Sequence, residues 1–141
     1  MDGHSRYCEI EHTADVGIET TGGTLEELFA NAAWGFTDMI TDASKIRATV
    51  QETVRVSAQD TEELLVRWLN EFLYLFDTRR LLFSTFRIEE LDERHISAVC
   101  TGEVFDPGHH TLRREIKAVT YHGLRVWRQG RLWMARVICD I

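Results

Sequence analysis

Proline is almost absent from this chain, and cysteine is scarce. A single Pro stands among 141 residues, and no low-complexity tract or linker-like stretch divides the sequence. The three cysteines, Cys8, Cys100 and Cys139, are odd in number, widely spaced and without a C-x-x-C motif. This pattern argues against a disulfide framework and against a cysteine-based zinc site. We therefore expect one domain over residues 1–141, in a reducing compartment.

Excess basic charge and long apolar runs are also lacking. The formal net charge is −7, which disfavours a primary role in gripping nucleic acid, because phosphate binding needs a basic surface. An acidic chain suits divalent cations, basic partners or simply solubility. The polar start, MDGHSRYCEIEH, has no signal-peptide core, and no stretch approaches the roughly 18 apolar residues of a membrane span. We expect a cytoplasmic protein that does not bind membranes.

Several enzyme signatures are missing as well. The chain contains no G-x-G-x-x-G, no Walker lysine loop, no G-x-S-x-G and no H-E-x-x-H. What it does contain is apolar residues, which make up 44% of the chain and include four Trp and seven Phe. This composition predicts a packed globular core and argues against disorder.

Two amphipathic helices are predicted, each starting with a capping box. The cap and box residues are Thr24 with Glu27, and Asp60 with Glu63. In a capping box the first side chain bonds the N–H of the third helical residue, whose carboxylate reaches back. Apolar residues then recur at helical spacing over 25–40 and 64–76. The second helix is expected to end near Asp77-Thr78.

The rest of the chain has the pattern of strands. The expected strands cover residues 6–11, 16–20, 49–58, 83–91, 95–105 and 114–122, and a hairpin over 124–141 turns at Gln129-Gly130. Two amphipathic helices packed on a mainly antiparallel β-sheet make an α+β fold of two or three layers. The last strand is apolar on both faces, which predicts a central strand covered on both sides.

Two acids at opposite ends of the chain are the most informative candidates. Asp15 comes where the strand pattern breaks, and Asp140 is penultimate on a strand predicted to be buried. A buried carboxylate is costly unless it is paired or metal-bound. With the α-carboxylate of Ile141 these oxygens suit Ca²⁺ or Mg²⁺ better than zinc. The alternative is a turn-forming Asp15 and a frayed chain end, and residue patterns alone leave both interpretations open.

Other reactive side chains have plainer interpretations beside the functional ones. Cys8 or Cys100 can act as a nucleophile only with a base nearby, and each is otherwise a small buried residue in a strand. His109-His110, close to Asp106, can bind a transition metal or lie in a solvated loop with the two rings pointing apart. His95 has the same two interpretations.

Basic residues occur in scattered groups. These are Arg79-Arg80, Arg113-Arg114, and Arg125 with Arg128 and Arg131. They can contact RNA or an acidic partner, or they can simply be exposed positions of strands and turns.

Four blocks of the sequence carry a family resemblance. They are HTADVGIETTGGTLEELFANAAWGFTDMITD, DTEELLVRWLNEFLYLFDT, EIKAVTYHGLRV and the terminal VICDI. In their order and spacing, from Tyr7 to Ile141, they resemble the archease family. One departure is Trp34, where many members carry a smaller aliphatic residue.

The resemblance implies a fold and a function. Archeases are α/β sandwiches related to the N-terminal domain of a redox-regulated heat-shock chaperone. They are cytosolic protein cofactors, not enzymes, and they activate the RtcB-type RNA ligase of tRNA splicing. That ligase joins 2′,3′-cyclic or 3′-phosphate ends to 5′-hydroxyl ends. Archease assists its GTP-dependent guanylylation and its multiple turnover, and contacts tRNA only through the ligase.

The resemblance also implies a site. The metal ligands fall on Asp15, Asp140 and Ile141; calcium is the first choice, with magnesium and manganese as alternatives. The functionally important lysine falls on Lys117, which by itself is either a phosphate binder or a solvated strand lysine. Further motif positions, which support the site or the fold, are His12, Asp42 and Glu71.

Two rival functions use the same residues differently. A small metal-dependent phosphohydrolase would employ the same acids, with His12 as its candidate general base. A chaperone-like protein would shield aggregation-prone clients, as the fold relative does.

Overall fold

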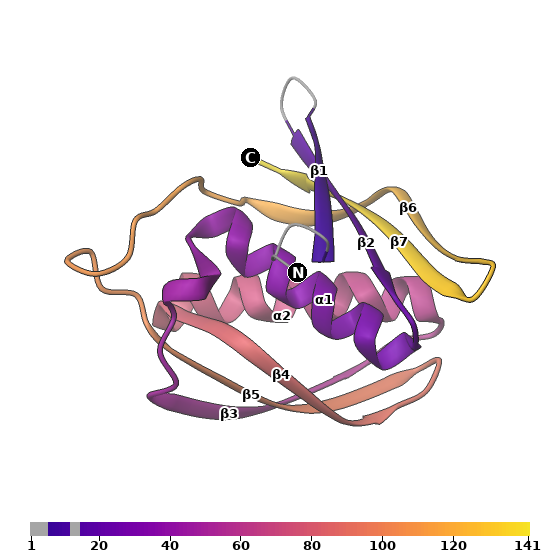
Figure 1. Ribbon diagram of the computed structural model, residues 1–141, viewed down its shortest axis with the longest axis horizontal. Helices are drawn as coiled ribbons and strands as arrows, with labels where there is room; N and C mark the ends of the chain where they lie inside the picture. The colour runs from indigo at the N-terminus through magenta and orange to yellow at the C-terminus, as the bar shows by residue number, and fades with distance from the viewer. Residues whose placement is uncertain (1–5, 12–14) are drawn as a thin grey trace.

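The computed structural model describes residues 6–11 and 15–141, and in it two α-helices lie between two antiparallel sheets (Figure 1). The strand orders are β1-β2-β7-β6 in one sheet and β3-β5-β4 in the other. The elements are β1 (Tyr7–Glu11), β2 (Asp15–Gly22), α1 (Leu25–Ile40), the 3₁₀-helix η2 (Ala43–Lys45), β3 (Val50–Ser57), α2 (Thr61–Arg79), β4 (Leu81–Leu91), β5 (His95–Val104), β6 (Ala118–Gln129) and β7 (Leu132–Asp140). The predicted α+β sandwich is confirmed, and it has three layers.

Both predicted helix caps are present, and in each the box glutamate bonds the N–H of the residue before the cap rather than that of the cap residue. The Oγ1 atom of Thr24 accepts the N–H of Glu27 at 3.1 Å, and the Glu27 carboxylate accepts the N–H of Gly23 at 2.8 Å. The second helix repeats this arrangement with Asp60, Glu63 and Gln59. It runs slightly further than predicted and ends where Arg80 takes a left-handed conformation with φ of 56°. At each helix the cap side chain satisfies one of the free N–H groups that every helix start leaves.

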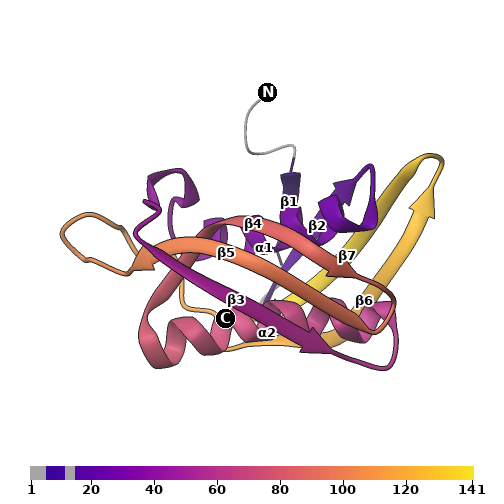
Figure 2. The same ribbon diagram turned by 90° about the horizontal axis from the view of Figure 1, so that it is seen from below.

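Aromatic residues of the helices join the three layers. Trp68 is fully buried, and its indole N–H donates to the carbonyl of Phe29 on α1 at 2.9 Å. Phe72 packs edge-on against Phe83 and Phe86 of the β3-β5-β4 sheet. Figure 2 shows this sheet lying across both helices. Burial of each such aromatic side chain contributes about 1.5–3 kcal/mol to folding. This packing holds both sheets in place on the helices.

β7 is central in its sheet, between β2 and β6, as predicted. The prediction that both of its faces are covered is wrong. The helices cover one face only, and on the other face Arg136 is exposed and Leu132 is 46% exposed. Ile138 is buried on this outer face because it packs beside Gly17 and Gly123, which have no side chains in the way.

The predicted strand over 114–122 is also wrong in its bounds. β6 begins at Ala118 and continues unbroken to Gln129, with a register shift between Thr120 and Arg125. Between Thr120 and Arg125, β6 has more residues than the facing part of β7, and an irregularity of the bulge type, with Gly123 at φ of 65°, accommodates them. The hairpin turn at Gln129-Gly130 is confirmed, and Gly130 has φ of 64°.

In the part of the chain that the structure describes, no helix combines the length and the apolar character needed to cross a membrane.

Candidate functional site

Asp15 and Asp140 lie directly opposite one another. Asp15 begins β2 and Asp140 ends β7, and because the two strands are antiparallel these residues are paired in the register. Paired residues of an antiparallel sheet point to the same face, with Cβ atoms about 5 Å apart. The two acids therefore share one end of the outer face of the β1-β2-β7-β6 sheet, close to the chain terminus (Figure 1).

The arrangement is electrostatically unfavourable without a cation. Like charges directly opposite each other in a sheet destabilise it. In addition, the Oδ1 atom of Asp15 is buried and has no hydrogen-bond partner among the described residues. A buried carboxylate oxygen without a partner is rare and costly. A divalent cation with oxygen ligands would relieve both problems, and Ile141, which follows Asp140, is 39% exposed. The residues present thus fit a hard cation.

Lys117 is held at the same end of the sheet. Its backbone N–H donates to the carbonyl of Asp140 at 2.8 Å, and the next residue, Ala118, is the register partner of Asp140. The side chain of Lys117 is exposed. The structure therefore brings Asp15, Asp140 and the main chain of Lys117 together from three separate parts of the sequence.

Asp42 and Glu71, two of the further motif positions, lie in other surroundings than the paired aspartates. Asp42 caps η2, where its Oδ1 atom accepts from the N–H and the hydroxyl of Ser44 at 3.0 and 2.6 Å. The hydroxyl of Ser44 is the main cause of the lowered pKa of Asp42. Glu71 lies on α2 and lines a shallow cavity with Arg55 and Tyr74. These contacts link neither residue to the paired aspartates. His12 lies outside the described residues.

Sequence reasoning missed Arg114 as a neighbour of the site. Its guanidinium pairs with Glu9 on β1. The pKa of Cys139 is raised to about 12, chiefly by burial and also by the charge of Asp140, while Arg114 acts in the opposite direction. Arg114 is thus within electrostatic range of the Asp140 end of β7. The only signal in the sequence was its position three residues before Lys117.

The connecting segment, residues 105–117, leads from β5 to this site without regular structure. It is held instead by the C-terminal end of α1. The Thr41 hydroxyl donates to the carbonyl of Thr111 at 2.7 Å, and Arg113 donates through its backbone to Ile40 at 2.6 Å. The Arg113 guanidinium also donates to the carbonyl of Asp38 at 2.8 Å. The positive charge of Arg113 is favourable at the C-terminus of a helix. Because the backbone of the segment bonds α1 instead of a neighbouring strand, no strand forms here.

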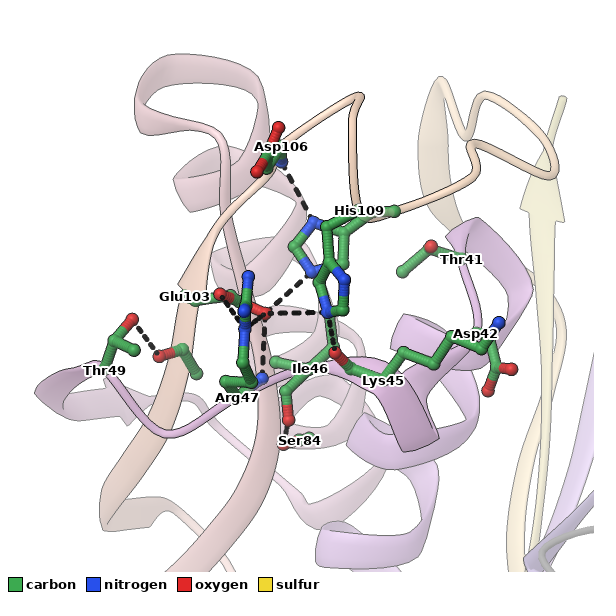
Figure 3. A network of polar contacts seen from close by, with 12 residues as sticks. Thr41, Asp42, Lys45, Ile46, Arg47, Thr49, Ser84, Glu103, Asp106 and His109 are labelled. Atoms are coloured by element: carbon green, nitrogen blue, oxygen red, sulfur yellow. Dashed lines mark hydrogen bonds and ion pairs between the residues drawn. The ribbon is translucent and has the colours of Figure 1, made fainter.

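A second polar cluster lies at the start of the connecting segment (Figure 3). Glu103 and His110 are buried, with exposed fractions of 5% and 3%. The Oε1 atom of Glu103 accepts from the backbone N–H of Arg47 at 2.8 Å and lies 2.7 Å from Nε2 of His110. His109 is also close, and its Nε2 atom lies 2.9 Å from the carbonyl of Lys45.

Hydrogen-bond partners argue against a metal in this cluster. The N–H of Asp106 donates to Nδ1 of His110 at 2.9 Å, so this nitrogen is an acceptor and Nε2 carries the proton. A metal on Nε2 would move the proton to Nδ1, where it would face the N–H of Asp106. Nε2 of His109 donates to a carbonyl. The alternative of a metal at His109-His110 is therefore not supported.

The solvated-loop interpretation is wrong for His110, which is buried. The two histidine rings do not point apart either, since their centres lie 4.7 Å from one another. The cluster keeps Glu103 charged. Burial raises the pKa of Glu103, but the bonds from Arg47 and His110 outweigh it and the net shift is downward. His95 is exposed and bonds Asp92, as expected for a solvated turn.

The cysteines are all free. Burial raises the pKa of the Cys100 thiol to about 12, so this residue has no thiolate character near neutral pH. The prediction that Cys8 is buried is wrong, because it lies exposed on the edge strand β1.

Comparison with known proteins identifies the family. Residues 7–141 match the model of the Archease protein family (MTH1598/TM1083). The chain belongs to the archease family. An archease of Pyrococcus furiosus is 42% identical over 141 residues, which cover 96% of this chain and 99% of the relative. One of Methanosarcina acetivorans is 40% identical over 140 residues, 96% of each chain.

Solved structures agree with this assignment. The solution structure of Methanobacterium thermoautotrophicum protein 1598 is 34% identical, with a TM-score of 0.81, and covers 97% of this chain and 99% of its own. The crystal structure of a Thermotoga maritima archease, described as a possible chaperone, has a TM-score of 0.63 over 94% of each chain. At 24% identity the second likeness supports the fold alone.

Proposed function

We propose that this archease activates an RtcB-type RNA ligase in the cytoplasm, assisting its GTP-dependent guanylylation and multiple turnover in tRNA splicing. In this proposal a divalent cation, calcium first and magnesium or manganese otherwise, is held by Asp15, Asp140 and Ile141. The observation that carries it is the pairing of Asp15 with Asp140 around a buried, unpartnered oxygen. At this metal site the protein would contact tRNA only through the ligase.

The chain's own residues suit presentation of charge to a partner. A bound cation would supply positive charge and free coordination positions for the oxygens of a nucleoside triphosphate. Lys117 would add a flexible ammonium group for phosphate at the same end of the sheet. The bonds of Arg113 to α1 and of Arg114 to Glu9 hold the connecting segment that carries Lys117. The cation and Lys117 would thus be positioned to act in the active site of the partner ligase.

The phosphohydrolase alternative lacks such support. It needs a general base beside the acids. His109 and His110 are committed to the cluster around Glu103, and His12 lies outside the described residues. We therefore keep hydrolysis by the isolated protein as a test outcome.

The test is ligation with limiting RtcB-type ligase, GTP and RNA ends bearing a 3′-phosphate and a 5′-hydroxyl. Asp140→Asn should lose the cation and reduce the stimulated multiple-turnover rate about ten-fold or more, because a cation ligand is lost. Lys117→Ala should retain the cation and still lose stimulation of guanylylation. Asp77→Asn, an exposed acid on α2, is the matched control and should behave as the wild type.

Undiminished stimulation by Asp140→Asn would contradict the site assignment. An extension after Ile141, which alters the terminal carboxylate, should act like Asp140→Asn. Phosphate release from a nucleotide by the isolated protein, abolished by Asp140→Asn, would favour the phosphohydrolase instead. Prevention of client aggregation without any effect on ligation would favour a chaperone.

A further inference from the structure

Basic charge is segregated in this acidic protein. Residues 116–139 contain five basic residues and no acidic one, in a chain of net charge −7. Four of the five are arginines of the β6–β7 hairpin. We call residues 125–136 the arginine hairpin, after Arg125, Arg128, Arg131 and Arg136.

The hairpin arginines are mostly free of acidic partners. Within the described residues, the ion pair found there joins Arg136 to Glu19 at 2.9 Å. Arg125 instead lies over the ring of Trp127, with its guanidinium carbon 4.4 Å from the ring centre. Arg128 lies over Trp133 in the same way, at 5.1 Å. Stacking holds these guanidinium groups in place while their N–H donors stay available.

The end of the hairpin stands clear of the body of the domain. Figure 2 shows the β6–β7 turn pointing away from the helices. Apart from its two chain neighbours, no described residue lies within 4 Å of the position that a Cβ atom would occupy at Gly130. Arg125 and Arg131 are exposed, and Leu132 is 46% exposed. A long, flexible ligand can therefore approach this end from several directions.

Neighbouring charges favour one face of the hairpin. Trp127 is the register partner of Met134, and Arg125 that of Arg136, so both lie on the outer face. The opposite face is close to the acidic start of α2, where Glu62 accepts the N–H of Val126 at 2.8 Å. A polyanion would meet repulsion there.

We propose that the outer face of the arginine hairpin binds single-stranded nucleic acid. Arg125 and Arg131 would contact phosphates through their N–H donors, and Trp127 would support stacking of a base on the guanidinium plane of Arg125. An acidic protein segment would also meet the arginines, but the interleaved aromatic rings favour a ligand with flat bases. This inference does not depend on the metal site, because Arg136, the register partner of Arg125, is four residues, or about 13 Å, from Asp140 along β7, and the turn of the hairpin is further away.

The test is fluorescence anisotropy of a labelled oligouridine of about 20 nucleotides, with the intact protein at salt concentrations from about 50 mM upward. The double variant Arg125→Ala/Arg131→Ala should weaken binding about ten-fold. It should also flatten the slope of log affinity against log salt by about 1.4, the value for two lost phosphate contacts on a single strand.

Two further variants sharpen the result. Arg55→Ala/Arg94→Ala removes the same charge from an exposed position on β3 and from the exposed turn between β4 and β5, and should leave affinity within about two-fold of the wild type. Trp127→Leu keeps an apolar side chain and should weaken binding about three-fold or more, with the salt slope unchanged. Thermal melts check that each variant is folded. An oligothymidine of equal length tells whether the 2′-hydroxyl matters.

Three outcomes would overturn the proposal. The wild type can fail to bind at low salt, or both double variants can weaken binding equally, which would indicate only general charge. Polyglutamate of equal length can bind as tightly as the oligonucleotide with no effect of Trp127→Leu, which would indicate an acidic protein partner.

Discussion

Cys139 lies one residue before Asp140, and its side chain is fully buried. Burial raises the pKa of its thiol, and that of Cys100, to about 12. Cys8, on an edge strand, is exposed. The three thiols of the protein should therefore differ in reactivity, because only a thiolate that solvent can reach attacks a disulfide reagent.

We expect thiol labelling of the native protein at mildly alkaline pH to modify Cys8 first. Cys100 and Cys139 should react at least about 100-fold more slowly, until denaturant exposes them. Mass spectrometry of the labelled peptides distinguishes the sites, and Cys8→Ser removes the fast phase as a control. Labelling of all three residues in a single phase would show that the sheet opens readily around Cys139.

At the scale of elements, the connecting segment shows how an irregular stretch becomes well placed. Its first part is attached through His110 to Glu103 of β5, and its last part through Arg113 to α1. A charged, buried Glu103 bonded to Arg47 and His110 should stabilise this attachment. The groups that face it are the guanidinium of Arg47, which follows η2, and the rings of the two histidines of the segment.

Glu103→Gln should lower the free energy of unfolding at neutral pH by about 2 kcal/mol, because its amide nitrogen would face a donor. The pKa of Glu103 is lower in the folded state than its ordinary value of 4.5. Its stabilising contribution is thus complete above that value and is lost as the pH falls through the lower folded pKa. The difference between variant and wild type should shrink below about pH 4.5.

Denaturant unfolding at several pH values measures this difference. Glu93→Gln, in the exposed turn between β4 and β5, is the matched control and should change stability by less than about 0.5 kcal/mol. A constant difference down to strongly acidic pH would contradict the role of the charged carboxylate.

At the scale of the whole molecule, one sheet joins the two ends of the chain. β2, near the N-terminus, pairs with β7, near the C-terminus, and the acids meet where these strands end. A cation bound there would link both ends of the fold and oppose global unfolding. Charge is also distributed along β7, with Asp140 at one end and the arginine hairpin at the other.

Millimolar calcium should therefore raise the melting temperature of the wild type by several degrees over a sample in chelator, since binding to the folded state alone is stabilising. Asp15→Asn should abolish this response. In chelator it should melt at or above the wild type, because it removes one of two opposed charges. Asp77→Asn should respond as the wild type. A full calcium response in Asp15→Asn would rule out this position as a ligand.

Much of the architecture could be predicted from the sequence. The caps at Thr24 and Asp60, the helical apolar pattern and the turn at Gly130 all depend on neighbours within a few residues. The start of β6 could not be predicted, because Arg113 bonds α1 rather than a strand. The burial of His110 likewise depends on Glu103 and on the fold around it.

The sequence by itself thus determined the two helices, most strands and the list of candidate acids, since these follow from local spacing and residue type. Only the tertiary structure decided that Asp15 faces Asp140 and that the Oδ1 atom of Asp15 is buried. The physical reason is that strand register is set by packing of the whole sheet on the helices. Residues at opposite ends of a chain become neighbours only through that packing.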